Sequence, residues 1–289
     1  MEYIHLHFLL KRSLQALVVA AFFIPSLAGQ DFIPYDMKYS QKEWEYYASK
    51  KIVTEKITRY STGKNFIPDG KPVNRNIFSY SPDGKLVSAV TIDSTGERID
   101  SFFYYAKGNF RRITTHTRNS KGFDPIRTLQ FINQSGKSPS EVLVFTHSSP
   151  DGLPSATYLY DYSEDKRKVK ILLMNLADSS VTDTSYIEYD NSGRKTKKWS
   201  RQESTEFKYD AAGNLIEKKE VTKAGTAITK YSLNNSGRPV KIAESSPGQT
   251  SSSELLYNMN GILILTKTKI DSGKTSPEKY EIEIREISY

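Results

Sequence analysis

A turn motif that recurs along most of the chain limits the possible folds more than any other feature of the sequence. Each copy has an aromatic residue, usually Tyr, followed by polar residues, Gly and a basic or polar residue. Successive motif glycines lie about 20 to 29 residues apart, as expected when each repeat is one supersecondary unit. The clearest copies cover residues 80–84, 189–193, 209–213 and 257–261, and looser copies end at Gly108, Gly136 and Gly237.

A second set of turn signals alternates with the first. Together the two sets predict a turn roughly every 12 residues, as an antiparallel meander requires. The segments between the turns are rich in β-branched and aromatic residues, or alternate polar with apolar residues, as 203–209 and 280–286 do. Each repeat is therefore predicted to be one β-hairpin. The glycines of the second set are at positions 96, 122, 152, 225, 248 and 273.

We predict an all-β fold, an extended antiparallel meander of about 14 to 16 strands in a curled or open sheet. The alternatives are a β-propeller, with its repeated blades, and a closed barrel. One early segment differs. Ser40 and Glu43 have the spacing of a capping box, and apolar residues follow at helical intervals. We expect a short N-terminal helix at about 41–51 that covers an end or an edge of the sheet.

The motif has a structural explanation. An Asp or Asn early in a turn can accept hydrogen bonds from backbone N–H groups two residues on. Gly then adopts a positive φ that other residues resist, and the preceding Tyr can lie across its equivalent on the next hairpin. A Ca²⁺ loop would need denser acidic ligands and a bidentate Glu. The residues assigned to these structural turns are Tyr80, Gly84, Tyr189, Asp190, Gly193, Tyr209, Asp210, Gly213, Asn214, Gly237, Tyr257 and Gly261.

Two copies of the motif resemble the YD repeats of bacterial Rhs-type proteins. The matching residues are Tyr189, Asp190, Gly193 and Arg194 in one copy, and the run YDAAGNLIEKK from Tyr209 in the other. The resemblance covers residues 75–289. It implies a long, curling antiparallel sheet on a secreted or surface protein of the bacterial envelope, in a short form without a toxin domain.

The first 28 residues have the pattern of a cleavable signal peptide. Lys11 and Arg12 precede an apolar run that Pro25 breaks, and Ser26 and Ala28 suit a cleavage site. The chain has no Cys, so it is not expected to be a lipoprotein. We predict a signal peptide at 1–28, a segment with the helix and the first strand at 29–74, and the repeat domain at 75–289. The mature chain is expected to lack a transmembrane span and to be periplasmic, on the cell surface or secreted.

The sequence lacks the residue sets of common catalytic and metal sites. It has no Cys, so thiolate metal sites and a Cys nucleophile are excluded. His116 and His147 lie in different predicted strands, and neither has a partner at the spacing of zinc ligands. The Gly-Lys-Thr at 273–275 lacks the first glycine of a phosphate loop. We predict that the protein is not an enzyme and has no cofactor or metal.

One segment is unusually basic. Residues 194–201 contain five Lys or Arg residues and one Trp. On a regular strand Lys195, Lys197, Trp199 and Arg201 share one face. This face is the candidate binding surface, with a sugar ring or an anionic polymer as its ligand. The alternative is that Trp199 covers the core at a sheet end while the lysines stay in water.

These features lead to one functional hypothesis and two alternatives. We expect an exported, non-enzymatic β-repeat protein of the bacterial envelope that acts as a binding or scaffold module. Its partner would be a glycan, an anionic surface polymer or another envelope protein, and not a nucleic acid. The alternatives are an outer-membrane β-barrel and a secreted polysaccharide-acting enzyme. The last strand argues against the barrel, because Ile287 and Tyr289 share a face with Arg285, Glu283 and Glu281.

Overall fold

The computed structural model describes residues 41–94, 96–105, 110–119, 122–132, 140–146, 153–273 and 277–289. They form one helix and a single sheet of 18 strands. The predicted signal peptide, and the looser turn copies that end at Gly108 and Gly136, lie outside the described residues.

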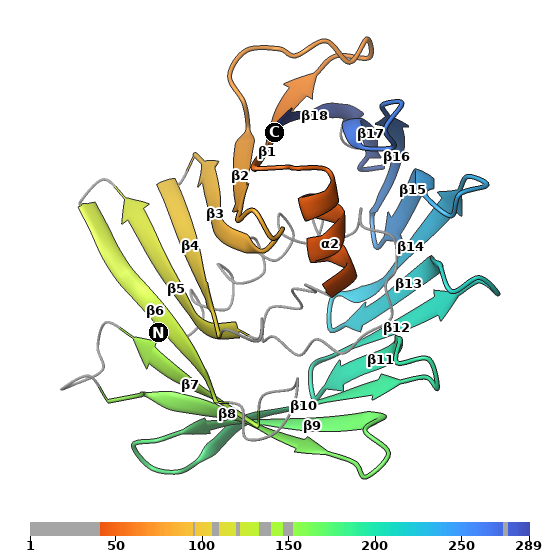
Figure 1. Cartoon of the computed structure of the whole chain (residues 1–289). Helices are drawn as coiled ribbons and strands as arrows, with labels where there is room; N and C mark the ends of the chain where they lie inside the picture. Colours follow the sequence, from red (N-terminus) through yellow and green to blue (C-terminus); the bar gives the residue numbers. More distant parts are fainter. Residues whose placement is uncertain are drawn as a thin grey trace.

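The strands follow one another around the ring that Figure 1 shows end-on. The helix is α2, Gln41–Ser49. The strands are β1 Thr54–Thr62, β2 Asn74–Tyr80, β3 Leu86–Asp93, β4 Gly96–Tyr104, β5 Phe110–Asn119, β6 Gly122–Ile132, β7 Glu141–Thr146, β8 Ala156–Tyr162, β9 Lys168–Asn175, β10 Val181–Tyr189, β11 Lys195–Ser200, β12 Glu203–Tyr209, β13 Leu215–Thr222, β14 Gly225–Leu233, β15 Pro239–Ser246, β16 Gln249–Tyr257, β17 Leu263–Asp271 and β18 Lys279–Ser288.

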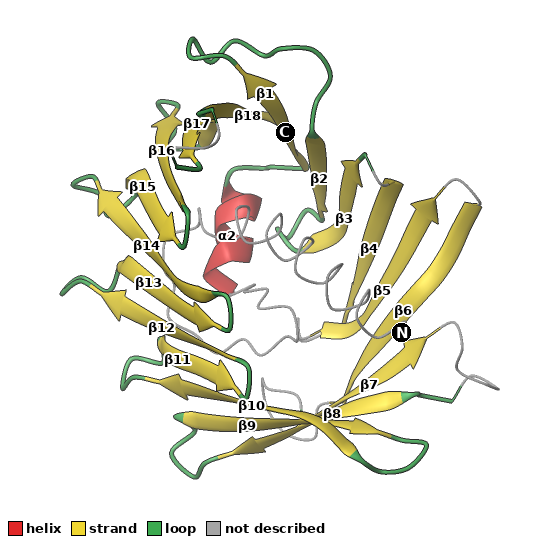
Figure 2. Ribbon diagram, turned by 180° about the vertical axis from the view of Figure 1, so that it is seen from behind, coloured by secondary structure: helices red, strands yellow, loops and turns green. Residues whose placement is uncertain are grey.

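The sheet closes on itself through its first and last strands. Each strand pairs antiparallel with its neighbours in sequence, and β1 also pairs with β18. Ile57 of β1, for example, lies opposite Asn76 of β2 on one side and Arg285 of β18 on the other. The result is an up-and-down barrel, seen from its other end in Figure 2. A closed barrel leaves no strand edge that could pair with another chain.

This architecture confirms the all-β antiparallel prediction and, among its alternatives, the closed barrel. The open or curled meander and the propeller are wrong, because hydrogen bonding continues from β18 through β1 to β2. There are also more strands than we predicted from the turn signals. Some turns lack glycine, and Lys166 and Ser179 adopt positive φ values of 54° and 56° there. A search for glycine-based turns misses such positions.

The helix is present where the sequence predicts it, but it does not cover an edge. Figures 1 and 2 show α2 inside the ring of strands. Its Tyr47 is buried and stacks on Tyr80 of β2, with ring centroids 4.2 Å apart and planes 15° from parallel. A closed sheet has no edge for a helix to protect, so α2 packs against the inner wall.

The contact between Tyr47 and Tyr80 identifies the inner face of every strand. Residues directly opposite each other on paired strands share a face, and so do alternate residues along a strand. Phe78 and Tyr80 therefore face the interior, and so do Ile57 and Arg285, which the register places on the same face. Irregularities in the register occur next to the aromatic residue of the motif, for example between Glu188 and Tyr189. They are β-bulges, which change the face that the following residues occupy.

The apolar core lies mainly against the inner wall of β2–β10. Leu86, Leu129, Val142, Val169 and Ile187 are almost fully buried there. Each such side chain contributes about 1.5–3 kcal/mol relative to an exposed one. Tyr47 and Ile52, from α2 and the segment after it, belong to the same cluster. The helix and this part of the wall thus share one core.

Candidate functional site

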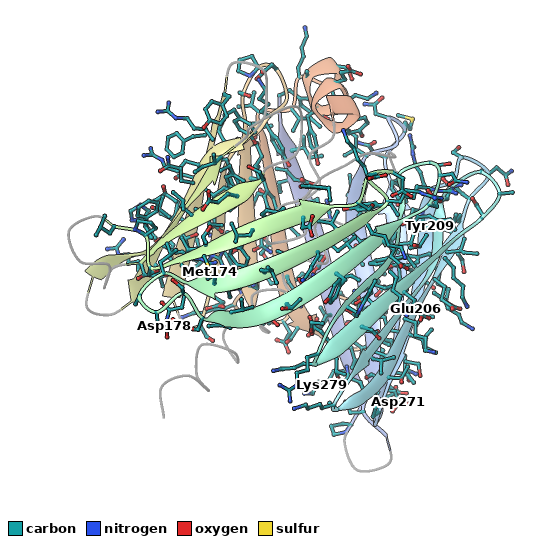
Figure 3. The ribbon with its side chains drawn as sticks, turned by 90° about the horizontal axis from the view of Figure 1, so that it is seen from below. Met174, Asp178, Glu206, Tyr209, Asp271 and Lys279 are labelled. Carbon is teal, nitrogen blue, oxygen red and sulfur yellow. The ribbon has the colours of Figure 1, made fainter. Side chains whose placement is uncertain are left out.

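The described motif turns all lie at one end of the barrel, which we call the motif rim. Figure 3 shows the barrel from the side, with Tyr209 near the end that holds α2 and with Asp271 and Lys279 at the opposite end. This arrangement follows from the antiparallel order, since turns that alternate along the chain alternate between the two ends. The motif rim is the one place where all the described copies of the repeat come together.

Asp210 organises its own turn. Its Oδ1 accepts a hydrogen bond of 2.8 Å from the backbone N–H of Asn214, and its Oδ2 accepts one of 3.0 Å from the Asn214 side chain. The Asp210 carbonyl accepts another from the N–H of Gly213, whose φ is +89°. The Asn214 side chain and backbone lower the pKa of the Asp210 carboxyl. Both carboxylate oxygens are therefore used within the turn.

Three other copies use the same backbone bonds. Asp190 accepts hydrogen bonds from the backbone N–H groups of Ser192 and Arg194, and Asn234 and Asn258 accept equivalent bonds. The motif glycines share positive φ values, at positions 84, 193, 213, 237 and 261. Asn occupies this position as well as Asp. The turn therefore needs a side-chain oxygen that accepts these hydrogen bonds, and it does not need a negative charge.

Neighbouring turns interlock through the residue that follows each glycine. Arg194 lies over Gly213, where a Cβ would stand 2.8 Å from its Nη1. Asn214 lies over Gly237 in the same way, with its Oδ1 at 2.8 Å. Arg238 lies over Gly261. At positions 213, 237 and 261 the glycine is thus needed twice, for its φ and for the space that the adjacent turn's side chain occupies.

The motif tyrosines add a second connection between turns. The Tyr209 hydroxyl donates a hydrogen bond of 2.8 Å to the carbonyl of Lys195, one turn back along the rim. Tyr257 donates to Pro239 at 2.7 Å, and Tyr104 donates to Leu86 at 2.7 Å. Burial raises the pKa of Tyr209 to about 12. The sequence predicts contacts between neighbouring tyrosines, whereas these tyrosines bond to the backbone of the preceding turn.

The predicted binding surface does not exist as one face. A bulge at Tyr189 places Lys195 on the inner wall, where it is buried. Its Nζ lies 5.8 Å from the centroid of the Phe207 ring. Lys197 and Trp199 lie on the outer wall, and Arg201 is exposed in the turn after β11. Two of the four residues therefore leave the face on which a regular strand would place them.

Trp199 is held by its neighbours. It stacks on Tyr186 of β10 at 5.2 Å, with planes 15° from parallel. The Lys197 ammonium group lies 5.6 Å from the Trp199 ring centroid. Two side chains of the barrel itself therefore contact the Trp199 ring, which is only partly buried. Trp199 does not cover the core at a sheet end either, since it lies on the outer wall.

The outer wall of β12–β17 is strongly charged, a feature that sequence reasoning missed. Lys208 forms an ion pair of 2.6 Å with Glu217, and Lys241 lies opposite Glu254. The period-two alternation in these strands could have revealed the pattern, but the bulges obscure which residues share a face. The charged residues that the register assigns to this outer wall are Glu206, Lys208, Glu217, Lys219, Lys230, Lys241, Glu254, Lys267, Lys269 and Asp271.

The part of the chain with described placement contains no cluster of three or more His, Cys, Asp or Glu residues suited to a metal ion. Within the same residues, no helix is both long and apolar enough to cross a membrane.

No family model matches the chain, and no curated protein matches it. It is similar to a porin-like protein from Bacteroides uniformis, with 9% identity over 82% of this chain and 96% of that chain, at a TM-score of 0.40. A porin-like protein from Bacteroides vulgatus has 13% identity over 81% and 97%, at 0.27. The Photorhabdus luminescens Tc holotoxin pore has 12% identity over 77% and 16%, at 0.29. Likeness at this level does not establish a shared function.

These findings correct the assignment to the YD-repeat family. No family model matches the chain, and its sheet closes into a barrel where the resemblance implies a long, curling sheet. The resemblance rests on a turn whose letters are fixed by backbone bonding. Any antiparallel barrel with regularly spaced turns can use the same Asx–Gly chemistry.

Proposed function

We propose that this protein is a closed β-barrel of the bacterial envelope that acts as a binding module and keeps its outer wall in water. The charged outer wall of β12–β17 is the observation that supports the water-facing position. Lys208, Lys230, Lys241 and Lys269 are exposed on it, and Lys230 lies near the middle of its strand. Each Lys on a lipid-facing wall would cost about 2–4 kcal/mol near the bilayer midplane.

Strand length also supports an outer wall that faces water. A strand that crosses a bilayer at a tilt needs about 9–11 residues. β7 and β11 have six residues each, and β2, β8 and β12 have seven. A lipid-facing band as tall as the bilayer core would therefore be interrupted at these short strands.

A second candidate function is that of an outer-membrane β-barrel. Closure favours it over a scaffold built on an open sheet, since only a closed barrel satisfies every strand hydrogen bond in lipid. The outer wall of β3–β9 is also more apolar and carries Val90, Ile99, Phe103 and Leu159. The polar face of β18 seemed, from the sequence alone, to argue against a membrane barrel. In the structure that face lines the interior, so it does not count against this candidate.

Phase partition separates the two candidates. A chain that starts at residue 29, purified without detergent, should be monodisperse and should stay in the aqueous phase of Triton X-114. Replacing Lys208, Lys230 and Lys241 by Leu should shift it towards the detergent phase. If the wild-type chain enters the detergent phase, and the full chain resists carbonate extraction from membranes of a Gram-negative host, the outer-membrane candidate replaces this proposal.

The binding role is proposed as non-enzymatic, with a glycan, an anionic surface polymer or another envelope protein as the partner class. A glycan array and a pull-down from envelope extract would test it. Hydrolysis of a polysaccharide by the purified chain, without stable binding, would contradict it and favour the secreted-enzyme alternative.

A further inference from the structure

A row of polar residues crosses the inner wall where the barrel closes. Asn74 of β2 lies opposite Arg59 of β1, Arg59 lies opposite Glu283 of β18, and Glu283 lies opposite Thr266 of β17. We call these four residues the polar row. Arg59 and Asn74 form the last registered pair of β1 and β2 before the loop that joins them. The row therefore starts near the end of the barrel opposite the motif rim.

Three side chains of the polar row have a buried oxygen without a hydrogen-bond partner in the described part of the chain. These atoms are Asn74 Oδ1, Thr266 Oγ1 and Glu283 Oε2. Asn74 is 7% exposed and Thr266 is 4% exposed. Buried polar atoms in native proteins are nearly always paired with protein, ordered water or a ligand. Three such atoms in one registered row indicate a place that receives hydrogen bonds from outside the wall.

The rest of the inner wall nearby does not show this pattern. The Thr268 hydroxyl, one pair further along β17, shares a hydrogen bond of 2.8 Å with Ser253. Asn76, next to Asn74 on the inner face of β2, accepts a bond of 3.0 Å from Thr91. Similar residues on the same wall are thus satisfied, and on the described inner face of β1, β2, β17 and β18 the unpaired oxygens all belong to the polar row.

The charges around the row favour a neutral ligand. Glu283 faces Arg59 and Arg285, and it also faces Glu281, which lies 3.7 Å from Arg59. Arg285 forms an ion pair of 2.5 Å with Glu55. Burial raises the pKa of the Glu283 carboxyl, and the two arginines oppose this shift. The two arginines would repel a cation and the glutamates would repel an anion.

We propose that the polar row is a binding site for a neutral, hydroxyl-rich ligand, an oligosaccharide that runs along the inner wall. Asn74 Oδ1 and Glu283 Oε2 accept hydrogen bonds from sugar hydroxyls, and the Thr266 hydroxyl can donate or accept. The row spans three strand spacings, about 14 Å, which suits a chain of sugar rings better than a single ring. This inference rests on the proposed binding function of the barrel.

Thr266→Val provides the sharpest test, because it should weaken binding without lowering stability. The substitution keeps the shape and removes a hydroxyl that makes no bond within the described wall, so the melting temperature should stay the same or rise. The probes are maltotriose, cellotriose and chitotriose, titrated calorimetrically at pH 7 into the detergent-free mature chain. At least one should bind, and Thr266→Val should weaken that binding about tenfold.

Thr268→Val is the matched control on the same strand and face. It removes a hydroxyl that is bonded to Ser253, so it should lower the melting temperature and leave trisaccharide binding within about twofold. If a trisaccharide binds equally to wild type and Thr266→Val, the site lies elsewhere although the binding function stands. If no trisaccharide binds to the folded, detergent-free chain, the polar row is not a site for neutral sugars. A wild-type chain that needs detergent to stay soluble would instead overturn the proposed function.

Discussion

Arg238 lies directly over Gly261 of the next motif turn, so close that a Cβ on Gly261 would stand 1.8 Å from its Nη1. The contact joins two turns that are 23 residues apart along the chain and adjacent along the motif rim. The contact therefore depends both on the spacing of the repeat and on the side chain that follows the earlier glycine.

Gly261→Ala should destabilise the barrel by more than Gly193→Ala. Both glycines have a positive φ, +72° and +74°, which costs another residue about 1–2 kcal/mol. Of these two glycines, Gly261 lies under an arginine, whereas nothing is within 4 Å of a Cβ at Gly193. Urea unfolding would measure both changes. In an Arg238→Ala background the difference between the two glycine substitutions should disappear, and equal costs in the wild-type background would contradict the interlock.

Tyr209→Phe and Tyr257→Phe should each lower the unfolding free energy by about 1 kcal/mol, because each removes a hydrogen bond to the backbone of the neighbouring turn. Tyr186→Phe is the control, since its ring stacks on Trp199 on the outer wall and the contact does not involve the hydroxyl. Chemical denaturation of the three variants tests this. A Tyr186→Phe cost as large as the others would remove the special role of the motif hydroxyls.

Asp210→Asn should make the protein less sensitive to acid. The bonds from Asn214 lower the pKa of Asp210 in the folded state, so the unfolded state binds the proton more readily. The stabilisation from the ionised group is present above its unfolded pKa of about 3.9, and is lost as the pH falls towards the lower folded value. Asn fills the same position at Asn234 and Asn258. Melting temperatures from pH 7 to pH 2 should fall less steeply for the variant, and parallel curves would contradict this account.

Glu55→Gln should destabilise the barrel by about 3–5 kcal/mol, because it removes the carboxylate that pairs with the buried guanidinium of Arg285. This ion pair joins the first strand to the last, so its loss should weaken closure. Glu217→Gln, which breaks the exposed pair with Lys208 on the outer wall, should have little effect. Thermal unfolding compares the two, and a similar small change in both variants would show that the inner pair does not support closure.

Chelation should leave the melting temperature unchanged. The oxygens of Asp210 that could bind a cation already accept hydrogen bonds from Asn214. A calorimetric scan with and without EDTA measures this. A fall in melting temperature with EDTA that Ca²⁺ restores would mean that the motif turns hold a metal.

The local features of the barrel could be predicted from the sequence because short segments specify them. Asp210 and Gly213 determine their turn through bonds that span four residues, and the same holds for the other motif copies. The alternation of two turn sets predicts antiparallel strands, and the spacing around Ser40 and Glu43 predicts a helix at the position of α2. Each of these depends on backbone geometry within a few residues.

The tertiary structure decided what depends on distant contacts. Closure requires β1 to pair with β18, through contacts such as that between Lys56 and Glu286, 230 residues apart. The face of each side chain depends on the bulges beside the motif, which separate Lys195 from Lys197 and Trp199 although alternation alone would keep them together. The polar row exists only because closure places Asn74 and Arg59, from the start of the barrel, beside Glu283 and Thr266 from its end.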